Sequence, residues 1–595
     1  MMTNKKTKEK NFKNLWSADF ETCTWLEDET YVWAWAVCNI ETKEVIIDNN
    51  IVSFMAFCKS HKNPTMYFHN LKFDGEFIIY WLLTHGFEYV DKKDRRDNTF
   101  STIISDLGMF YSIEVYFKVG NKSVKKVTFI DSLKIIPLSV EDISKAFGLE
   151  ESKLELDYDT PREIGHILTQ QEKDYISHDV IITAKALKEL FNSGLTHMTQ
   201  ASNAMHDYKD IIGLNRFNRL FPKLNYEIDE DIRRAYKGGF TYLNPRWKEV
   251  DVDAGVVLDV NSLYPSVMYE KPMPFGEGIF YEGKYEDDPV YPLYIQCITC
   301  AFEIKKDHIP TIQIKEKGRR SIFKQNEYLE SSLGEIVTLV LTSVDLKLFL
   351  EQYDIYDEKY ECGWKFKQMT GVFTDYIDKW INEKIKASKE GNKGKRQIAK
   401  LMLNSLYGKF ATSLELQSKK PILCEDGRIS YEDLDPEIVE GMYIPIGAFI
   451  TAYAREKTIR TSQAIKTYSI ETYGEDLYFY SDTDSIHCGL DIDELKNFCD
   501  IDDYRLGAWK HESTFTKARF VRQKCYIEEI DGKMEITCAG MPKSCYKYVE
   551  WDKFKEGFTC RGKLNFTHVK GGVKLVEETF TIMPERSLKR SLAKW

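Results

Sequence analysis

The sequence predicts an α/β protein built from several domains. The chain of 595 residues is longer than one hydrophobic core usually supports, and its composition, 43% hydrophobic and 13% aromatic, is that of a globular protein. Short apolar runs typical of buried strands end in acidic residues, and amphipathic helical patterns follow them. No apolar run reaches the roughly 20 residues that a membrane-spanning helix needs, so we expect no membrane segment.

Charge and cysteine content narrow the class. The net charge of −11 argues against a broadly basic surface, although carboxylate clusters that hold metals count in this sum. The 13 cysteines are odd in number and scattered, which predicts reduced thiols in a cytoplasm. Cys297 and Cys300 lack a second matching pair, which disfavours a zinc site. Residues 1–14 are lysine-rich without an apolar segment after them, so we expect a mobile basic tail and no secretory signal. Local basic stretches occur at residues 122–126, 315–320, 384–400 and 510–524.

Acidic residues mark the strands of the first third. Asp19 and Glu21 lie two apart in a predicted strand over residues 15–25, so their side chains share one face. Asn70 and Asp74 lie beside the end of a later strand, where a helical pattern starts. Taken singly, these acids also suit a turn or a helix cap.

A helix with a clear start carries the next acid. Thr169 as N-cap and Glu172 three residues later form a capping box. Tyr175 and Asp179 are four apart and therefore share a face, although an exposed helix acid would look the same. Four such carboxylates converging on one point would hold two divalent cations and hydrolyse a phosphodiester.

The middle of the chain adds a glycine pair and a strand-end acid. The run from Tyr236 to Gly239 ends in two glycines, which let the backbone approach a phosphate or another strand, or form a hairpin turn. The apolar residues 256–258 predict a strand that ends in Asp259, and Pro265 follows early in a helix. This arrangement presents a carboxylate.

A helical pattern over residues 389–412 carries a mixed polar stripe. Arg396, Lys400, Asn404 and Tyr407 fall within an arc of roughly 80°. A solvated basic helix would explain the charges alone, whereas the added amide and ring favour a surface that binds phosphate and base.

The acidic turn from Tyr480 to Ser485 follows a buried aromatic run. Asp482 and Asp484 are two apart, so on a strand or tight hairpin we expect them to project on one side. Neighbouring carboxylates repel unless a cation lies between them, and hard divalent ions take oxygen ligands. A solvated loop is the alternative. Lys524, within the basic and aromatic residues 517–526, suits a nucleic-acid backbone or an exposed basic strand.

Three of these motifs occur in a specific order: Asp259-x-x-Ser-Leu-Tyr-Pro, Lys400-x-x-x-Asn-Ser-Leu-Tyr-Gly and Tyr480-Ser-Asp-Thr-Asp-Ser. They resemble the polymerase motifs of the family B DNA polymerases, and the acids before them resemble the 3′–5′ proofreading exonuclease domain of that family. The residues around the second motif, with the Tyr-Lys-Gly-Gly run, are similar to the small protein-primed polymerases of tailed phages and linear plasmids. The resemblance covers about residues 15–582.

The resemblance implies an RNase H-like exonuclease domain and a right-hand polymerase with palm, fingers, thumb and two insertions. The expected boundaries are a tail (1–14), the exonuclease domain (15–198) and the polymerase domain (199–595), with palm (199–310 and 443–540), first insertion (311–370), fingers (371–414), second insertion (415–442), thumb (541–583) and a C-terminal extension (584–595).

For the exonuclease site, the resemblance implies three sets of residues. The metal ligands would be Asp19, Glu21, Asp74 and Asp179; the residues assisting catalysis would be Tyr175 and Lys153; the residues holding single-stranded DNA would be Thr22, His69, Asn70, Phe73, Ser132 and Leu133.

For the polymerase site, it implies that Asp259 and Asp484, with Val260, hold two Mg²⁺ ions, for which Mn²⁺ could substitute, while Asp482 acts as an auxiliary acid. Lys400 would neutralise phosphates. The dNTP would be bound by Tyr264, Val260, Lys389, Arg396, Asn404, Tyr407 and Gly408. The DNA would be bound by Tyr236, Gly239, Ser262, Thr451, Arg455, Lys524 and Tyr526.

The implied partners are a DNA primer-template and a terminal protein, which would form a heterodimer with a monomeric polymerase. The first insertion would contact the terminal protein, and the second would encircle DNA for processivity and strand displacement. The implied location is the cytoplasm of a bacterial host. A conventionally primed family B polymerase is the closest alternative. A nuclease with an inactive polymerase half and a non-catalytic replication scaffold are two others, and the intact acids of both sites argue against them.

Overall fold

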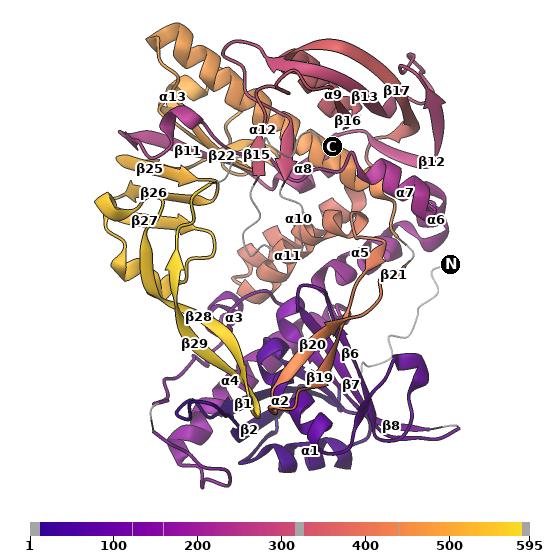
Figure 1. Cartoon of the computed structure of the whole chain (residues 1–595), viewed down its shortest axis with the longest axis vertical. Coiled ribbons are helices and arrows are strands. Elements are labelled where there is room, and N and C mark those ends of the chain that lie inside the picture. Colours follow the sequence, from indigo (N-terminus) through magenta and orange to yellow (C-terminus); the bar gives the residue numbers. More distant parts are fainter. Residues whose placement is uncertain (1–11, 122, 159, 316–325, 440, 586–595) are drawn as a thin grey trace.

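The computed structural model describes residues 12–121, 123–158, 160–315, 326–439 and 441–585. The N-terminal domain lies at one end of the molecule, a layered body of sheets and helices lies at the other, and the C-terminal strands run down one side between them (Figure 1). Within the described ranges, no helix has the length and apolar character needed to cross a membrane.

The N-terminal domain is built on one eight-stranded sheet with the order β3-β2-β1-β4-β8-β7-β6-β5. Strand β1 is largely buried, because it lies between β2 and β4 at the centre of one half of this sheet. The helix predicted to start at Thr169 does so, and its capping box with Glu172 is confirmed. The strands are β1 (Leu15–Thr22), β2 (Val32–Asn39), β3 (Val45–Asp48), β4 (Thr65–Phe68), β5 (Glu88–Tyr89), β6 (Thr99–Ile104), β7 (Phe110–Val119) and β8 (Val124–Asp131), and the helices are α1 (Ile51–Ser60), α2 (Leu71–Thr84), α3 (Val140–Phe147) and α4 (Gln170–Asn192).

A second sheet, antiparallel and with the order β24-β11-β23-β22-β9, forms the floor of the C-terminal body. The long helix α12 (Ile444–Tyr473) packs against it, and all residues from Ile444 to Arg455 are buried. The associated elements are β9 (Thr241–Leu243), β11 (Gly255–Val260), α8 (Leu263–Glu270), β22 (Tyr478–Asp482), β23 (Ser485–Cys488), α13 (Ile492–Leu495) and β24 (Trp509–Phe515).

The predicted first insertion shares a sheet with strands that precede it. This sheet has the order β12-β17-β13-β16, and it joins strands of residues 273–304, which the sequence assigned to the palm, to strands within residues 311–370. The elements are β12 (Met273–Glu282), β13 (Leu293–Ile304), β14 (Gln313–Lys315), β15 (Asn326–Tyr328), β16 (Val337–Thr342), α9 (Ser343–Gln352) and β17 (Tyr353–Met369).

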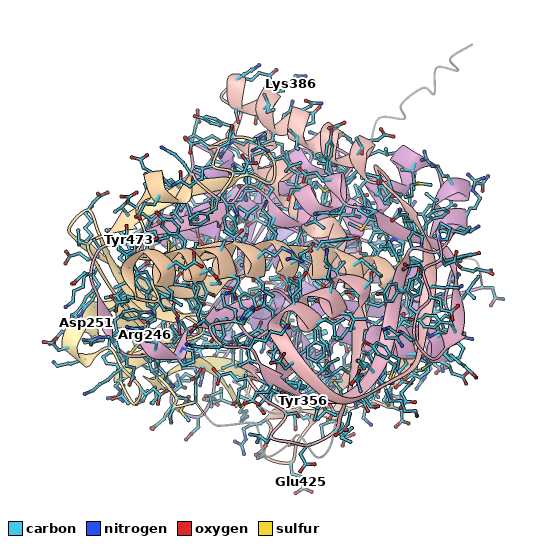
Figure 2. The ribbon with its side chains drawn as sticks, turned by 90° about the horizontal axis from the view of Figure 1, so that it is seen from above. Arg246, Asp251, Tyr356, Lys386, Glu425 and Tyr473 are labelled. Atoms are coloured by element: carbon cyan, nitrogen blue, oxygen red, sulfur yellow. A yellow bond between two sulfur atoms is a disulfide. The ribbon has the colours of Figure 1, made fainter. Side chains whose placement is uncertain are left out.

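Two paired helices lie between the sheets. The single helical pattern predicted over residues 389–412 is wrong at its start, because α10 (Thr374–Lys389) ends there and Gly391, with φ of +67°, turns the chain into α11 (Lys393–Phe410). Gly213 likewise ends the helix that precedes it in the chain, α5 (Gln200–Ile212). Lys386 of α10 lies at the edge of the molecule, far from Glu425 of the second insertion (Figure 2). The helices leading to this pair are α5 (Gln200–Ile212), α6 (Leu214–Leu220) and α7 (Tyr226–Arg233).

Two hairpins reach from the C-terminal body to the N-terminal domain (Figure 1). Tyr431 of β20 donates to the Glu76 carboxylate at 2.8 Å, and His568 of β28 lies 3.1 Å from the same carboxylate. Glu76 is a buried residue of α2, so both hairpins meet at one point of this helix. The strands concerned are β18 (Glu415–Leu416), β19 (Lys419–Leu423), β20 (Ile429–Asp433), β21 (Glu437–Ile438), β28 (Thr559–Val569) and β29 (Gly572–Thr581), while β10 (Asp251–Val252), β25 (Lys517–Arg522), β26 (Cys525–Ile530) and β27 (Lys533–Cys538) form the sheet beside them.

Two sequence predictions about termini and thiols need correction. Phe12 is buried against Phe191 at 5.8 Å between ring centroids, so the tail is anchored by residue 12, whereas residues 1–11 and 586–595 lie outside the described residues. Cys545 and Cys560 form a disulfide, so the prediction of reduced thiols is wrong for this pair.

Candidate active sites

The carboxylates of Asp259 and Asp484 meet at one end of the second sheet. Asp259 lies near the end of β11, and Asp484 lies in the turn between β22 and β23. The pairing of β11 with β23 places Ser485 opposite Asp259. The Val260 amide donates to the Asp484 carbonyl at 2.8 Å, which fixes the turn against the strand end. Both acids line one cavity of about 1090 Å³.

This cavity holds buried negative charge. Burial and the neighbouring Asp484 raise the pKa of Asp259 to about 7, and burial raises the pKa of Asp484. Lys510, paired with Asp259 in the strand register, directs its amine to Glu512 at 2.6 Å. Two half-buried carboxylates, one of which raises the pKa of the other, suit a bound divalent cation. Val260, whose side chain is buried and apolar, can offer such an ion only its backbone.

The opposite wall is cationic and aromatic. Tyr264 stacks on Tyr407 with 4.0 Å between centroids and 20° between planes. Lys384, which the sequence placed in a basic stretch but not in the site, has a lowered pKa because of burial and then of Arg396 and Lys400. Cations crowded in this way favour an anionic ligand. The predicted residues Val260, Ser262, Tyr264, Lys389, Arg396, Lys400, Asn404 and Tyr407 all line the cavity. Gly408 lies on the same helix α11 but is not among the lining residues.

Asp482 does not share this cavity. Its carboxylate accepts from Lys524 Nζ at 2.6 and 2.7 Å and from Thr241 Oγ1 at 3.1 Å. Thr483 between the two acids has φ of +59°, so the chain turns and the prediction that both acids project on one side is wrong. Tyr526 packs on Tyr480 behind this ion pair, with 5.3 Å between centroids.

Two of the predicted DNA-binding residues are buried. Thr451 is 1% exposed, and its hydroxyl bonds to carbonyls of its own helix. Arg455 is 5% exposed and forms a salt bridge with Asp345. Both are therefore unsuited to direct contact with a strand of DNA. Gly239 lies against Thr483, so its close approach is to another strand's turn, and Tyr236 beside it is partly buried.

The second group of acids lies in the N-terminal domain. Asp19 and Glu21 on β1 and Asp179 on α4 line a cavity of about 480 Å³. Burial and then Asp179 raise the pKa of Asp19 to about 8, and burial, Asp19, Asp179 and Asp74 raise that of Glu21. The buried Oδ1 atoms of Asp74 and Asp179 have no hydrogen-bond partner in the described part of the chain. Four adjacent acids, two of which have an oxygen without a hydrogen-bond partner among the described residues, fit cation ligands.

Two polar neighbours complete this site. Lys153 Nζ lies 3.7 Å from Asp179 Oδ2, and the Tyr175 hydroxyl lies 2.6 Å from that of Tyr158. Tyr158 was not predicted, because a lone tyrosine in an irregular segment carries no pattern. Leu564 and Leu575 of the β28–β29 hairpin also line the cavity, although they follow every other lining residue by more than 380 positions in the sequence.

The residues predicted to hold single-stranded DNA divide into two groups. Thr22, His69 and Phe73 line the cavity. Ser132 is fully buried and hydrogen-bonds to His69 Nδ1 at 3.0 Å, so it positions the histidine and has no surface for DNA. Leu133 and Asn70 are held by the same unpredicted acid, because Asp131 Oδ1 accepts from both of their amides.

Neither site is a complete set of ligands as it stands. Among the described residues, no three histidine, cysteine, aspartate or glutamate side chains are already arranged around a metal position, and this includes the area of Cys297 and Cys300. Asp259 and Asp484 line one cavity, and Asp19, Glu21 and Asp179 line the other, where Asp74 is next in sequence to the lining residue Phe73.

The protein-family model described as DNA polymerase type B, organellar and viral, matches residues 58–168 and 160–501 of this chain. The DNA polymerase of Bacillus phage phi29 is 44% identical over 591 residues, covering 96% of this chain and 99% of that protein. The DNA polymerase of Streptococcus phage Cp-1 is 30% identical over 600 residues, covering 95% of this chain and 98% of that protein.

Solved structures agree with this result. The structure of phi29 DNA polymerase complexed with primer-template DNA and incoming nucleotide substrates superimposes with a TM-score of 0.88 at 43% identity, covering 96% of this chain and all of that one. The fold expected from the sequence, an exonuclease domain joined to palm, fingers and thumb with two insertions, is thereby confirmed. The chain belongs to the organellar and viral type B DNA polymerases, and within them to the group of the phi29 enzyme.

Proposed function

We propose that this DNA polymerase carries out templated nucleotidyl transfer in the cavity between Asp259 and Asp484, and removes 3′-terminal nucleotides in the cavity around Asp19. The single observation that supports the division is the presence of two separate groups of buried, mutually repelling carboxylates on two different sheets.

In the polymerase cavity, Asp259 and Asp484 would hold two Mg²⁺ ions, or Mn²⁺ in their place. Bound ions supply charge neutralisation at the phosphates and lower the pKa of the attacking hydroxyl. Lys400, Arg396 and Lys384 neutralise the triphosphate, because these cations crowd together in the lining of the cavity. The stacked Tyr264 and Tyr407 form the floor under base and sugar.

Asp482 has a different role in this proposal. Its ion pair with Lys524 keeps the lysine at the edge of the turn, where an incoming primer strand can take the ammonium as its own partner. Asp482 thus acts as an auxiliary acid through Lys524.

In the exonuclease cavity, Asp19, Glu21, Asp74 and Asp179 would hold the metal ions. Tyr175, aligned by Tyr158, orients the attacking water, and Lys153 stabilises Asp179. Leu564 and Leu575 of the predicted thumb suit an unpaired terminal base, because they offer an apolar surface in the cavity that holds the acids.

We also propose that replication of a linear phage or plasmid genome starts from a terminal protein, which would form a heterodimer with a monomeric polymerase in the cytoplasm of the bacterial host. The two insertions support this mode, and the contact of the β19–β20 hairpin of the second insertion with α2 supports strand displacement. Conventional nucleic-acid priming remains the alternative.

The test uses a 5′-labelled primer-template with Mg²⁺, with and without dNTPs, and the variants Asp484→Ala and Asp19→Ala. Asp484→Ala should abolish extension and leave shortening intact, and Asp19→Ala should do the reverse. Equal loss of both activities in either variant would contradict two separate sites. Priming is tested separately with labelled dNTP and candidate terminal proteins. A nucleotide attached covalently to protein, and dependent on Asp484, is the expected product.

A further inference from the structure

Residues 237–242, here called the backing segment, lie directly behind the turn that carries Asp484. Thr483 of that turn donates its amide to the Phe240 carbonyl at 2.6 Å, and Thr241 Oγ1 donates to Asp482 at 3.1 Å. A Cβ on Gly239 would lie only 2.6 Å from Thr483 Oγ1. The turn and the backing segment are therefore in tight contact, and one cannot shift without the other.

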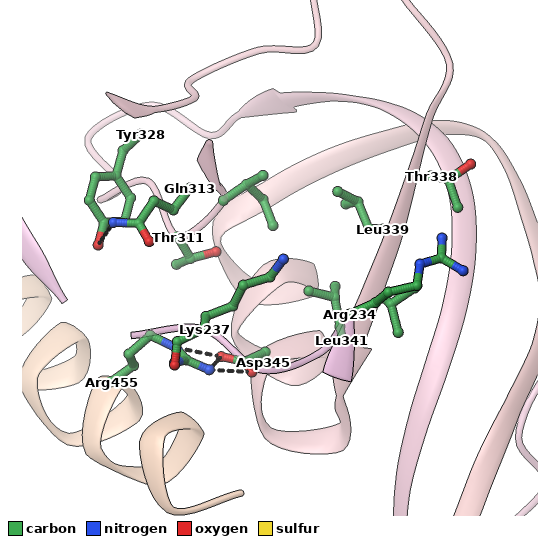
Figure 3. A pocket seen from close by; sticks show the side chains of 12 residues that line it. Arg234, Lys237, Thr311, Gln313, Tyr328, Thr338, Leu339, Leu341, Asp345 and Arg455 are labelled. Carbon is green, nitrogen blue, oxygen red and sulfur yellow. Dashed lines mark hydrogen bonds and ion pairs between the residues drawn. The ribbon is translucent and has the colours of Figure 1, made fainter. Parts of the chain in front are cut away.

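Arg455 of α12 holds the other side of the backing segment (Figure 3). Its Nη1 donates to the carbonyls of Lys237 and Gly238 at 2.9 and 2.7 Å. Its Nε and Nη2 donate to the Asp345 carboxylate at 3.0, 2.9 and 2.7 Å. All three nitrogens of the guanidinium therefore donate within the protein. A buried arginine held in this way is poorly placed to bind a DNA phosphate.

Asp345 belongs to the first insertion. It lies in the first turn of α9, where Thr342, the N-cap, donates to Asp345 Oδ2 at 2.8 Å. The same insertion touches the backing segment a second time, since the Thr241 amide donates to the Tyr328 hydroxyl at 3.3 Å.

Helix α12 also reaches the turn directly. Thr458, three residues after Arg455 and so on the same face, donates its hydroxyl to the Thr483 carbonyl at 2.7 Å. One rigid helix therefore sets both the turn and the segment behind it.

From this geometry we infer that Arg455 and Asp345 are positioning residues of the polymerase site: they fix the backing segment, and through it the turn of Asp484. The inference rests on the proposed role of Asp484. The first insertion is then a structural part of the polymerase site, because its residue Asp345 fixes the position of the Arg455 guanidinium.

The experiment compares Asp345→Asn, Arg455→Lys and the double variant in single-turnover extension. Each single variant should lower the maximal extension rate by about 10- to 100-fold, because misplacement of reacting groups by an ångström costs about this much. The affinity for primer-template and the rate of single-strand degradation should stay within about twofold. The double variant should be no slower than the slower single variant, because both changes break one unit.

A DNA-contact role predicts a different pattern. Arg455→Lys would then keep most activity because it keeps the charge, while loss of the contact would weaken DNA binding and reduce its salt dependence by about one phosphate. Asp345→Asn would not weaken DNA binding. That pattern, or unchanged extension rates in both variants, would overturn the inference.

Two further variants keep the result decisive. If the ion-pair variants also lose degradation, they are misfolded, and the comparison passes to Thr342→Ala and Thr342→Ser. The alanine removes the hydroxyl that holds Asp345 together with the methyl group, and the serine removes the methyl group alone, so alanine should slow extension several-fold and serine should not. Equal rates would overturn the inference. Asp484→Ala tests the underlying proposal by itself, because extension that survives it would refute the role of Asp484 whatever the other variants do.

Discussion

Replacing Gly239 with alanine tests how tightly the turn that carries Asp484 is held. The added Cβ would lie 2.6 Å from Thr483 Oγ1, 2.7 Å from Cγ2 and 3.1 Å from Cβ, where ordinary contact starts at 3.4 Å. The nearest pair must therefore separate by about 0.8 Å, the difference between 3.4 and 2.6 Å. Rotation of Thr483 about χ1 can turn only one of its two outer atoms away, so the backbone has to move.

That movement should reach Asp484, the next residue. Because about 1 Å of misplacement costs roughly 100-fold, we expect the maximal extension rate of Gly239→Ala to fall about 30- to 100-fold. Affinity for primer-template should change little. Rapid-quench extension at saturating dNTP measures the rate. Gly120→Ala is the matched control, since its nearest new contact is an ordinary 3.5 Å.

A second substitution tests whether contact with Thr483 causes the loss of activity. Thr483→Ala removes both outer atoms and leaves only the contact at 3.1 Å, so Gly239→Ala combined with Thr483→Ala should extend at least several-fold faster than Gly239→Ala alone. Wild-type extension by Gly239→Ala, or no recovery in the double variant, would show that contact with Thr483 does not control the turn.

Three other perturbations have expected outcomes. Tyr158→Phe removes the hydroxyl 2.6 Å from that of Tyr175, so single-strand degradation should slow about tenfold while extension is unchanged in the same gel assay; equal degradation would contradict the alignment role. The pKa of Asp259 is raised to about 7, so its favourable contribution to folding is complete below its ordinary range and is lost as pH rises through about 7. Added Mg²⁺ should therefore raise the melting temperature more at pH 8 than at pH 5.5, and an equal rise measured by calorimetry would count against a cation there. Tyr431→Phe removes a 2.8 Å hydrogen bond to Glu76, so products made in the presence of trap DNA should be shorter, whereas unchanged lengths would mean that this contact does not retain DNA.

The sequence predicted much of the fold and the acidic residues that line both cavities, apart from Asp503 and Glu512. The capping box at Thr169 fixed the register of α4, and with it the common face of Tyr175 and Asp179. The helical arc of Arg396, Lys400, Asn404 and Tyr407 faces one cavity, because a period of 3.6 residues needs no knowledge of the partner surface.

The errors arise where the backbone leaves regular periodicity or where distant segments meet. Spacing by two placed Asp482 beside Asp484, but the left-handed turn at Thr483 sends them to different partners. Nothing near Arg455 in sequence reveals that Asp345, 110 positions earlier, occupies its guanidinium. Burial of such a pair is a property of the assembled fold.

The packing between the two catalytic domains determines how the variants can be interpreted. One continuous core includes residues of α4 and of α11, and the Glu189 carboxylate of α4 lies against Gly394 in the first turn of α11. A substitution that unfolds either domain should therefore impair both activities together. Loss of extension with intact degradation, as expected for Asp484→Ala and Gly239→Ala, cannot come from general unfolding of this shared core. Selective loss is for this reason the informative result, and the exonuclease serves as an internal measure of folding for every variant of the polymerase site.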